Sequence, residues 1–392
     1  MQDTTADTED IVAFCFELAE GDIADLRRRL AATRWPEPET TGDWSQGVRL
    51  GWLSELAEYW RTSFDWSLFQ DRLNRFPQFK TTIDGLGIHF LHVRSPHADA
   101  VPLLLTHGWP GSIVEFLEVI GPLVDPAVDG GDPSQAFHVV CPSLPGYGFS
   151  EKPSATGWNK ERTADAWVEL MARLGYGEFF AQGGDWGSIV TTTLAQRHPA
   201  KLLGLHLNLA IVTPDPATAD ELTEFERQSI AHAAEFMKSG RGYSEIQSTR
   251  PQTLGYGLTD SPVGQLAWIT DKYWAWCDHD GDPFDALTRE QMLDNVSLYW
   301  FMRTAASAAR SYWESVQETA DTGIYRQTRL VTPPSAITIF PQEIIRPSRR
   351  WCEKFYPDLR FYELAPRGGH FAASEQPLLF IDQVRRAFAT MR

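Results

Sequence analysis

The sequence has few of the features that mark a metal-binding, disulfide-bonded or membrane protein. Its 392 residues include only four cysteines, far apart and without C-x-x-C spacing. Neither a zinc site nor a disulfide framework is indicated, and a reducing cytoplasm is the expected location. No apolar run approaches the roughly 18 residues needed to cross a bilayer. Residues 1–10 are acidic and polar, unlike a signal peptide. The cysteines are Cys15, Cys141, Cys277 and Cys352.

Positive charge is also scarce. Lys and Arg number 35 against 52 Asp and Glu, and the formal net charge of -17 argues against nucleic acid and anionic membrane surfaces as partners. Hydrophobic residues make up 43% and charged residues 22% of the chain, which are ordinary values for a globular protein. The length suits one large domain or two smaller ones. We therefore expect a soluble globular protein.

Strand-like and helix-like runs alternate between residues 101 and 210. This alternation predicts a mostly parallel sheet with helices on both faces. Two strand-like runs on either side of Asp84-Gly85 predict a hairpin ahead of it, at 79–83 and 88–94. The expected strands are 101–106, 137–142, 178–182 and 202–210, and the expected helices are 112–124, 160–174 and 188–197.

Helical segments lie before and after this alternating region. Residues 10–75 read as helices and loops packed on the core, and a polar, mainly helical stretch begins after Pro214. A strand pattern resumes at 335–340, so we expect the intervening helices to form a lid inserted into an α/β core. Strand 360–364 and helix 377–390 close the chain. The expected divisions are an N-terminal helical segment (1–78), a first part of the core (79–212), the lid (213–330) and a second part of the core (331–392).

The stretch Gly183-Gly-Asp-Trp-Gly187 lies between a strand-like run and a helical one. This context is what a nucleophile elbow requires. The glycines two residues before and two after Asp185 would let the strand and helix backbones approach closely, and the helix N-terminus would stabilise negative charge. A bare G-x-D-x-G is more often an ordinary turn or a helix cap, so the interpretation depends on the rest of the chain.

An aspartate at the centre of an elbow limits the chemistry. A serine that attacked an alkyl carbon would leave a stable ether. A carboxylate instead leaves an ester, which water can cleave at its acyl carbon. The expected substrate is therefore an electrophilic sp3 carbon with a leaving group, such as an epoxide or an alkyl halide.

Two polar residues follow the late strands. Glu343 comes just after strand 335–340, and His370 comes after strand 360–364. The order nucleophile, acid, histidine is the one expected of the α/β-hydrolase fold. His370 would be the general base that activates water, and Glu343 would orient it and stabilise its imidazolium form. Each alone would more often be a loop or core residue, but together with Asp185 they favour catalysis.

A turn with glycine and proline, Thr106-His-Gly-Trp-Pro-Gly111, follows the first strand of the alternating region, where such folds form the second oxyanion donor. The backbone N–H groups of Trp109 and Trp186 could hold the negative oxygen that appears when water attacks the ester, at about 3 kcal/mol per donor. Taken alone, this segment could equally be a plain turn.

No metal, nucleotide or other cofactor is expected. Asp278-His-Asp-Gly-Asp282 begins like a calcium loop, but Pro283 and Arg289 occupy the positions of its glycine and glutamate, so a solvated acidic loop is expected. Gly146-Tyr-Gly148 lacks the final glycine of a dinucleotide fingerprint. His89 and His92 would face opposite sides of their strand, which makes a shared metal unexpected.

Taken together, these segments resemble the epoxide hydrolase branch of the α/β-hydrolases, and within it the microsomal-type group with a long N-terminal segment. The resemblance covers nearly the whole chain, and residues 23–36 look like that group's N-terminal domain. The group's membrane anchor is absent, which implies a soluble, bacterial-type member. The similar segments are His107-Gly-Trp-Pro-Gly-Ser112, Pro145-Gly-Tyr-Gly-Phe-Ser150, Gly183-Gly-Asp-Trp-Gly-Ser188, Gly242-Tyr-Ser-Glu-Ile-Gln247, Asp260-Ser-Pro262 and Arg367-Gly-Gly-His-Phe-Ala-Ala373.

The resemblance also implies roles for individual residues. Asp185 corresponds to the nucleophile, His370 to the base and Glu343 to the acid. Two lid tyrosines of that family look like Tyr243 and Tyr312, and their phenols would polarise the epoxide oxygen and protonate the departing alkoxide. Sequence alone could not select this pair. The tyrosines of the expected lid are Tyr243, Tyr256, Tyr273, Tyr299, Tyr312 and Tyr325.

The sequence therefore predicts a cofactor-independent epoxide hydrolase that makes a vicinal diol. The 12% of aromatic residues suggests a bulky or aryl epoxide, and both natural-product biosynthesis and xenobiotic breakdown are left open as its role. A haloalkane dehalogenase is the nearest alternative, because it shares the aspartate and uses Trp N–H groups for halide. A ligand receptor on the same fold is the alternative of another class. The expected partners are the epoxide and, in a homodimer, a second copy of the chain.

Overall fold

The computed structural model describes residues 10–318 and 329–392. Residues 1–9, the polar N-terminus of the sequence analysis, lie outside the described residues, and so does Tyr325 of the expected lid. In the part of the chain that is described, none of the helices has the length and apolar character that crossing a membrane would require.

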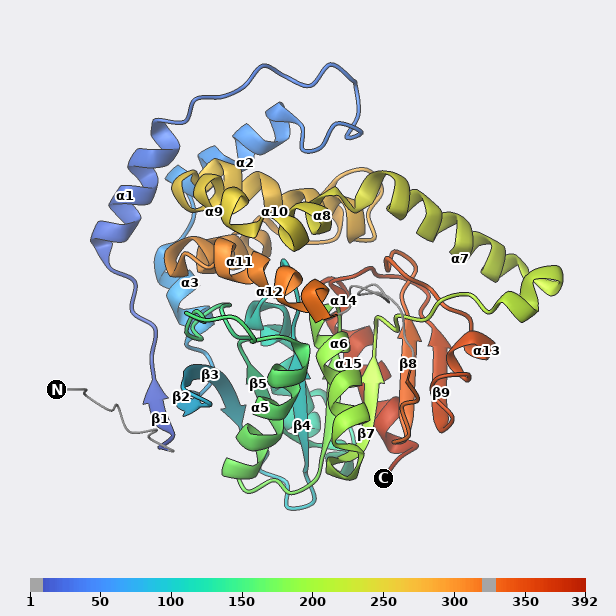
Figure 1. Ribbon diagram of the computed structural model, residues 1–392. Helices are drawn as coiled ribbons and strands as arrows, with labels where there is room; N and C mark the ends of the chain where they lie inside the picture. Colours follow the sequence, from blue (N-terminus) through green and yellow to red (C-terminus); the bar gives the residue numbers. More distant parts are fainter. Residues whose placement is uncertain (1–9, 319–328) are drawn as a thin grey trace.

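A nine-stranded sheet, as counted over the described residues, forms the centre of the molecule (Figure 1). Its strand order is β1-β2-β3-β5-β4-β6-β7-β8-β9, antiparallel from β1 to β5 and parallel from β5 to β9. The strands are β1 Val12–Phe14, β2 Gln78–Ile83, β3 Leu86–Val93, β4 Val101–Thr106, β5 Phe137–Pro142, β6 Phe179–Gly183, β7 Leu202–Leu207, β8 Ser335–Ile339 and β9 Leu359–Leu364. The predicted α/β class and mostly parallel sheet are confirmed.

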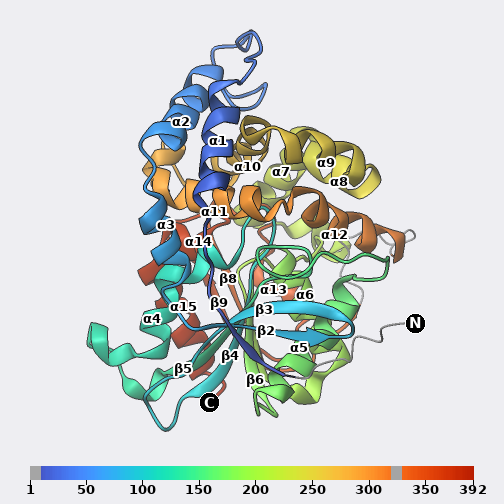
Figure 2. The same ribbon diagram turned by 90° about the vertical axis from the view of Figure 1, so that its left-hand side faces the viewer.

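Helices cover both faces of the sheet because its central strands are apolar on both sides. Every residue of β6 is buried, as are the last four of β4. α5 and α6 pack together on one face, and α4 and α15 pack together on the other (Figure 2). Their bounds are α4 Leu117–Val124, α5 Lys160–Arg173, α6 Trp186–Arg197 and α15 Pro377–Ala389. The short helix α13 Arg349–Cys352 lies beside β9 (Figure 1), and the short helix α14 Ala372–Glu375 packs against α15 and α4.

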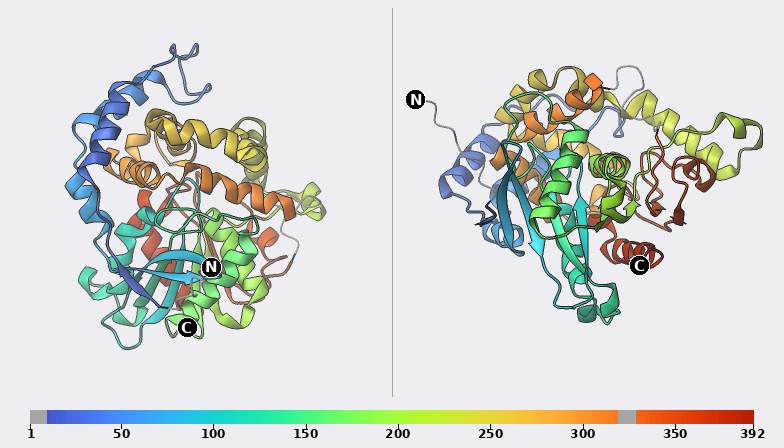
Figure 3. Two further views of the ribbon diagram at one scale, coloured as in Figure 1. Left: turned by 60° about the vertical axis from the view of Figure 1, so that its left-hand side comes forward. Right: turned by 60° about the horizontal axis from the view of Figure 1, so that its bottom comes forward.

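Among the described residues between β7 and β8, six α-helices form a layer over the carboxyl ends of the parallel strands (Figures 1 and 3). We call this layer, within residues 224–318, the lid. Capping boxes at Thr223 and Thr288 begin two of its helices by satisfying their first backbone N–H groups. The lid helices are α7 Glu224–Glu235, α8 Gly242–Thr249, α9 Pro251–Asp260, α10 Pro262–Trp276, α11 Arg289–Met302 and α12 Ala305–Glu318.

The N-terminal region rises from the sheet edge along one side of the molecule to the lid (Figure 2). It contains α1 Glu20–Ala31, α2 Leu50–Thr62 and α3 Trp66–Leu73, as the sequence predicts. The expectation of helices and loops alone from residue 10 is nevertheless wrong, since β1 pairs antiparallel with β2. β1 has only three residues and no apolar alternation, so its pairing with a distant strand carries no local signal.

The other boundaries differ from the expected ones by small amounts, with three informative exceptions. The expected helix 112–124 is a 3-10 turn at Ile113–Phe116 followed by α4. The expected strand 202–210 ends at Leu207. Helix α6 begins two residues earlier than expected, directly after Asp185, and this early start positions the elbow.

Candidate active site

Asp185 lies at the sharp turn between β6 and α6. Its backbone has φ 49° and ψ -127°, a conformation that side-chain-bearing residues rarely adopt. Such a backbone costs about 1–3 kcal/mol and persists only where the surrounding structure enforces it. The strain places the carboxylate at the carboxyl ends of the parallel strands, beneath the lid. This is the strand, turn and helix geometry of a nucleophile elbow.

The turn depends on glycines that let backbones touch. A Cβ atom on Gly187 would overlap the carbonyl oxygen of Thr106, at the end of β4. A Cβ atom on Gly183 would overlap the carbonyl of Gly187. Strand β4, strand β6 and helix α6 therefore meet more closely than any side chain would allow.

Gly187→Ala should destabilise the fold. Because the clash is with backbone rather than a flexible side chain, we expect a loss of about 3 kcal/mol in the free energy of unfolding, measured by urea denaturation. Gly121→Ala is the matched control: it adds the same methyl inside α4, where nothing lies within 4 Å. It should be neutral or stabilise by up to about 1 kcal/mol. Equal midpoints for the two variants would contradict this account of the elbow.

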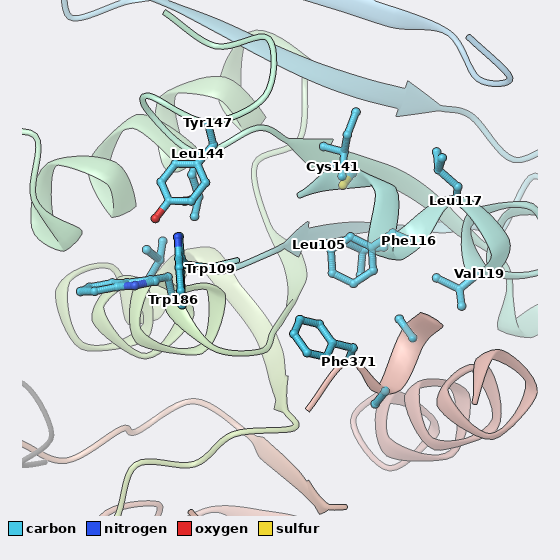
Figure 4. Close-up of a cluster of buried hydrophobic side chains, with 14 of the residues drawn as sticks. Leu105, Trp109, Phe116, Leu117, Val119, Cys141, Leu144, Tyr147, Trp186 and Phe371 are labelled. Atoms are coloured by element: carbon cyan, nitrogen blue, oxygen red, sulfur yellow. The ribbon is translucent and has the colours of Figure 1, made fainter. Parts of the chain in front are cut away.

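Backbone from the end of β4 holds one oxygen of the Asp185 carboxylate. The N–H of Trp109 donates to Asp185 Oδ1 at 2.7 Å. A Cβ atom on Gly108 would overlap the Asp185 side chain, so only glycine admits the carboxylate here. Figure 4 shows Trp109 and Trp186 at the edge of a buried cluster that also contains Leu144. The oxyanion roles of the two tryptophan N–H groups stay predictions.

The other carboxylate oxygen faces His370. The distance from His370 Nε2 to Asp185 Oδ2 is 3.3 Å, and the opposite ring nitrogen, Nδ1, lies 2.7 Å from Glu343 Oε1. Glu343 Oε1 also accepts a hydrogen bond from the N–H of Ile344 at 2.7 Å, which fixes its direction. The His370 and Glu343 side chains are 3% and 0% exposed. The structure thus brings together the three side chains that the sequence proposed as a triad.

Electrostatics favours the charged form of His370 while Asp185 is ionised. Burial alone would lower the pKa of His370, but the charge and hydrogen bond of Glu343, together with those of Asp185, raise the pKa well above its usual value. If Asp185 became an ester, one of the two negative charges would vanish. The pKa of His370 would then fall, and the imidazole would become available as a base.

The lid places two tyrosine rings above the elbow. Tyr243, near the start of α8, stacks on Trp109 with ring centroids 4.8 Å apart, and Tyr312, in α12, packs edge-on against Trp186, also at 4.8 Å. The two tyrosine rings are 5.9 Å apart. Both rings therefore pack against the tryptophans that flank Asp185.

Four further tyrosines were expected in the lid, and three fall within the described residues. Tyr273 accepts a hydrogen bond from Asn295, Tyr299 donates to the carbonyl of Gly111, and Tyr256 is 70% exposed. The hydrogen bonds of Tyr273 and Tyr299 indicate structural roles, and the exposure of Tyr256 indicates a surface position. Ring geometry thus separates Tyr243 and Tyr312 from the others, which the sequence pattern could not do.

Two titratable residues near the site escaped the sequence reasoning. Burial raises the pKa of Glu115 to about 8 against the opposing effect of nearby His370, so this carboxyl group is uncharged at neutral pH. Lys272, 6% exposed, places its ammonium 4.6 Å from the ring centre of Tyr243 and pairs with Asp271. Glu115 follows the turn at Trp109 closely enough to have been suspected, whereas nothing local singles out Lys272.

The acidic loop at 278–282 is more than a solvated loop, so that expectation is wrong for Asp278. Its Oδ2 accepts a hydrogen bond from the N–H of Gly368 at 2.7 Å, beside the loop of His370. Asp282 accepts from the indole N–H of Trp52. No cluster of three potential metal ligands occurs among residues 10–318 and 329–392.

Comparison with known proteins gives consistent matches over nearly the whole chain. One family model, described as the epoxide hydrolase N terminus, matches residues 11–116, and another, described as the alpha/beta hydrolase fold, matches residues 101–240. A Stigmatella aurantiaca protein provisionally named an epoxide hydrolase is 51% identical over 97% of this chain and 86% of its own length.

A mammalian protein and a solved insect structure agree. Epoxide hydrolase 1 of Sus scrofa is 36% identical over 97% of this chain and 89% of its own length. The crystal structure of juvenile hormone epoxide hydrolase from the silkworm Bombyx mori matches with a TM-score of 0.88 at 30% identity, covering 98% of this chain and 95% of that one.

Proposed function

This chain belongs to the epoxide hydrolases with the α/β-hydrolase fold, and from that membership we propose that it adds water to an epoxide through an ester on Asp185. The observation that carries the proposal is the Asp185 carboxylate held between the Trp109 N–H and the His370 imidazole. Neither the dehalogenase nor the receptor alternative has support among the relatives named above, and no other function is favoured by a feature of the site.

The first step opens the epoxide ring. Asp185 Oδ2 attacks a ring carbon, and the carbon–oxygen bond on the opposite side breaks. The departing oxygen takes a proton from Tyr243 or Tyr312, which becomes a tyrosinate. Oδ1 stays on the Trp109 N–H and becomes the carbonyl oxygen of the ester. The products of this step are a hydroxyalkyl ester on Asp185 and a phenolate.

The second step returns the enzyme to its starting state. His370 takes a proton from water, whose oxygen attacks Cγ of Asp185, and the negative charge develops on the oxygen held by Trp109. The intermediate collapses, the diol leaves with the former Oδ2 and a proton from His370, and Asp185 is left as a carboxylic acid. That acid returns its proton to the tyrosinate. The net reaction consumes one epoxide and one water and gives one diol.

The aromatic surroundings support a bulky or aryl substrate. Trp109, Trp186, Tyr243 and Tyr312 pack around the carboxylate, and Trp276 extends this group of rings toward His370. Flat apolar rings favour a flat apolar ligand.

We also propose, from the sequence, that the chain divides into the four parts given above, that it is cytoplasmic and that it forms a homodimer. Light scattering in solution measures the oligomeric state directly.

A single turnover in water labelled with oxygen-18 tests the ester route. With enzyme in excess over a styrene-type epoxide, the diol should carry no label, because its new oxygen comes from Asp185. Mass spectrometry should find the label in the peptide that contains Asp185. A labelled diol in the first turnover would mean direct attack by water and would overturn the scheme. Halide release from a haloalkane, assayed in parallel, should be absent.

A further inference from the structure

The end of lid helix α10 is fastened to the loop that carries His370. The N–H of His370 donates to the carbonyl of Trp276 at 2.9 Å, and the N–H of Gly368 donates to the Asp278 carboxylate at 2.7 Å. These bonds join a lid segment, Trp276 to Asp278, with a core segment, Gly368 to Phe371. We call the joined segments, together with Glu375, the clasp.

Glu375 bridges the two sides of the clasp with its carboxylate. Oε2 accepts from the N–H of Asp278 at 2.8 Å, and Oε1 accepts from the N–H of Phe371 at 2.9 Å. The residue is 7% exposed. A buried carboxylate is expensive unless its oxygens are hydrogen-bonded, and each oxygen here binds a backbone N–H, one in the lid and one in the His370 loop.

The two segments also touch directly. A Cβ atom on Gly369 would overlap the carbonyl oxygen of Trp276, so the contact requires glycine. The Trp276 ring packs against the His370 ring at 4.9 Å between centroids and against the Tyr243 ring at 5.2 Å. A continuous set of contacts therefore runs from Glu375 to the imidazole.

Other contacts seat the lid on the core without the clasp. In α11, Asn295 donates to the carbonyl of Pro110 at 2.7 Å, and Tyr299 donates to that of Gly111 at 2.9 Å. Beside α12, Tyr147 donates to the carbonyl of Ala308 at 3.1 Å. Breaking the clasp should consequently loosen the His370 loop while leaving the lid in place above Asp185.

We propose that Glu375 and Asp278 are positioning residues that hold His370 for the hydrolysis of the Asp185 ester by tying its loop to the lid. The inference rests on the proposed function. Ring opening does not need the clasp, because Asp185 is held by the elbow and by Trp109. Hydrolysis does need it, since the base must deliver water to Cγ from a fixed place.

Burial and hydrogen bonding act on the pKa of Glu375 in opposite directions. Burial raises its pKa to about 7, against the opposing effect of the two N–H bonds and of nearby His370, while the charge of Asp278 adds to the increase. The titratable groups that face it are Asp278, His370, Cys277 and Glu115. The ionised form accepts both N–H bonds, so a rise in pH favours the full clasp.

Two variants separate this role from general support of the fold. Glu375→Gln keeps one acceptor and turns an amide N–H toward the other donor, and Asp278→Ala removes the acceptor for Gly368. Asp280→Asn removes a charge from the same loop at an exposed residue outside the clasp and is the matched control. Rapid-quench mass spectrometry at pH 8 follows formation and decay of the ester on Asp185 in each protein.

Both clasp variants should form the ester at the control's rate and hydrolyse it more slowly. A displacement of His370 by about 1 Å would slow hydrolysis about 100-fold. In the steady state, kcat and KM should then fall together. The proposal would be overturned if the ester decayed at the control's rate in both variants, or if ester formation and ester decay were slowed by the same factor. If Glu375→Gln fails to fold, the Asp278→Ala variant tests the proposal by itself, because the Asp278 side chain is only half-buried and its loss is compatible with folding. A labelled diol in the first turnover in oxygen-18 water would instead refute the proposed function, and this inference with it.

Discussion

Replacing His370 with glutamine should leave the enzyme esterified at Asp185. Ring opening needs only the carboxylate and an acid, so the first turnover proceeds. Hydrolysis then lacks the base whose Nε2 lies 3.3 Å from Asp185 Oδ2, and turnover should fall by about 10² to 10⁴-fold. Intact-protein mass spectrometry should show one added substrate mass per chain, and peptide mapping should place it on Asp185.

The matched control is His97→Gln. His97 also pairs with a carboxylate, Asp125, at 2.8 Å, but this pair is a quarter to a third exposed and belongs to a surface loop. That variant should turn over like the unmodified enzyme and carry no added mass. An unesterified His370→Gln protein that still makes diol would remove His370 from the reaction and leave the base unassigned.

Removing both lid phenols should abolish ring opening while sparing ester hydrolysis. In the double variant Tyr243→Phe, Tyr312→Phe the rings still pack on Trp109 and Trp186, so the change is confined to two O–H donors. Loss of one donor to a developing oxyanion costs about 10² to 10³-fold, and the pair should cost at least about 10³-fold. The rate of ester formation under rapid quench measures the effect.

Tyr256→Phe is the control for this experiment. It makes the same chemical change on an exposed lid tyrosine and should leave the rate of ester formation unaltered. The single variants Tyr243→Phe and Tyr312→Phe show whether one phenol is the main proton donor. A double variant that still opens the epoxide at the control's rate would place the acid elsewhere, and the tyrosine assignment would be wrong.

Local sequence patterns predict the strands, turns and helices whose apolar periodicity is contained in a short stretch of chain. The strand, turn and helix around Asp185 follow from glycines and apolar runs within about 20 residues, and the sheet class follows from the same alternation. Glu343 and His370 could be proposed because the ends of neighbouring parallel strands share one edge of a sheet. The structure places both where that rule expects them, beside Asp185.

What the sequence did not indicate depends on contacts between distant segments. Strand β1 exists because β2 offers it an edge more than 60 residues further along the chain. Asp278 looked like part of a solvated loop because its acceptor role depends on Gly368, far ahead in the chain. The tyrosine pair could be named only by family likeness, since ring packing, not spacing, distinguishes Tyr243 from Tyr273.

The order of the strands along the chain has a consequence for the protein while it is being made. Asp185 and Trp109 are synthesised early, whereas Glu343 and His370 arrive with β8, β9 and the loop beyond, after every helix of the lid. The sheet and the triad are therefore completed by the same late segments, and a chain that has not yet reached β8 and β9 lacks both the acid and the base that release the ester.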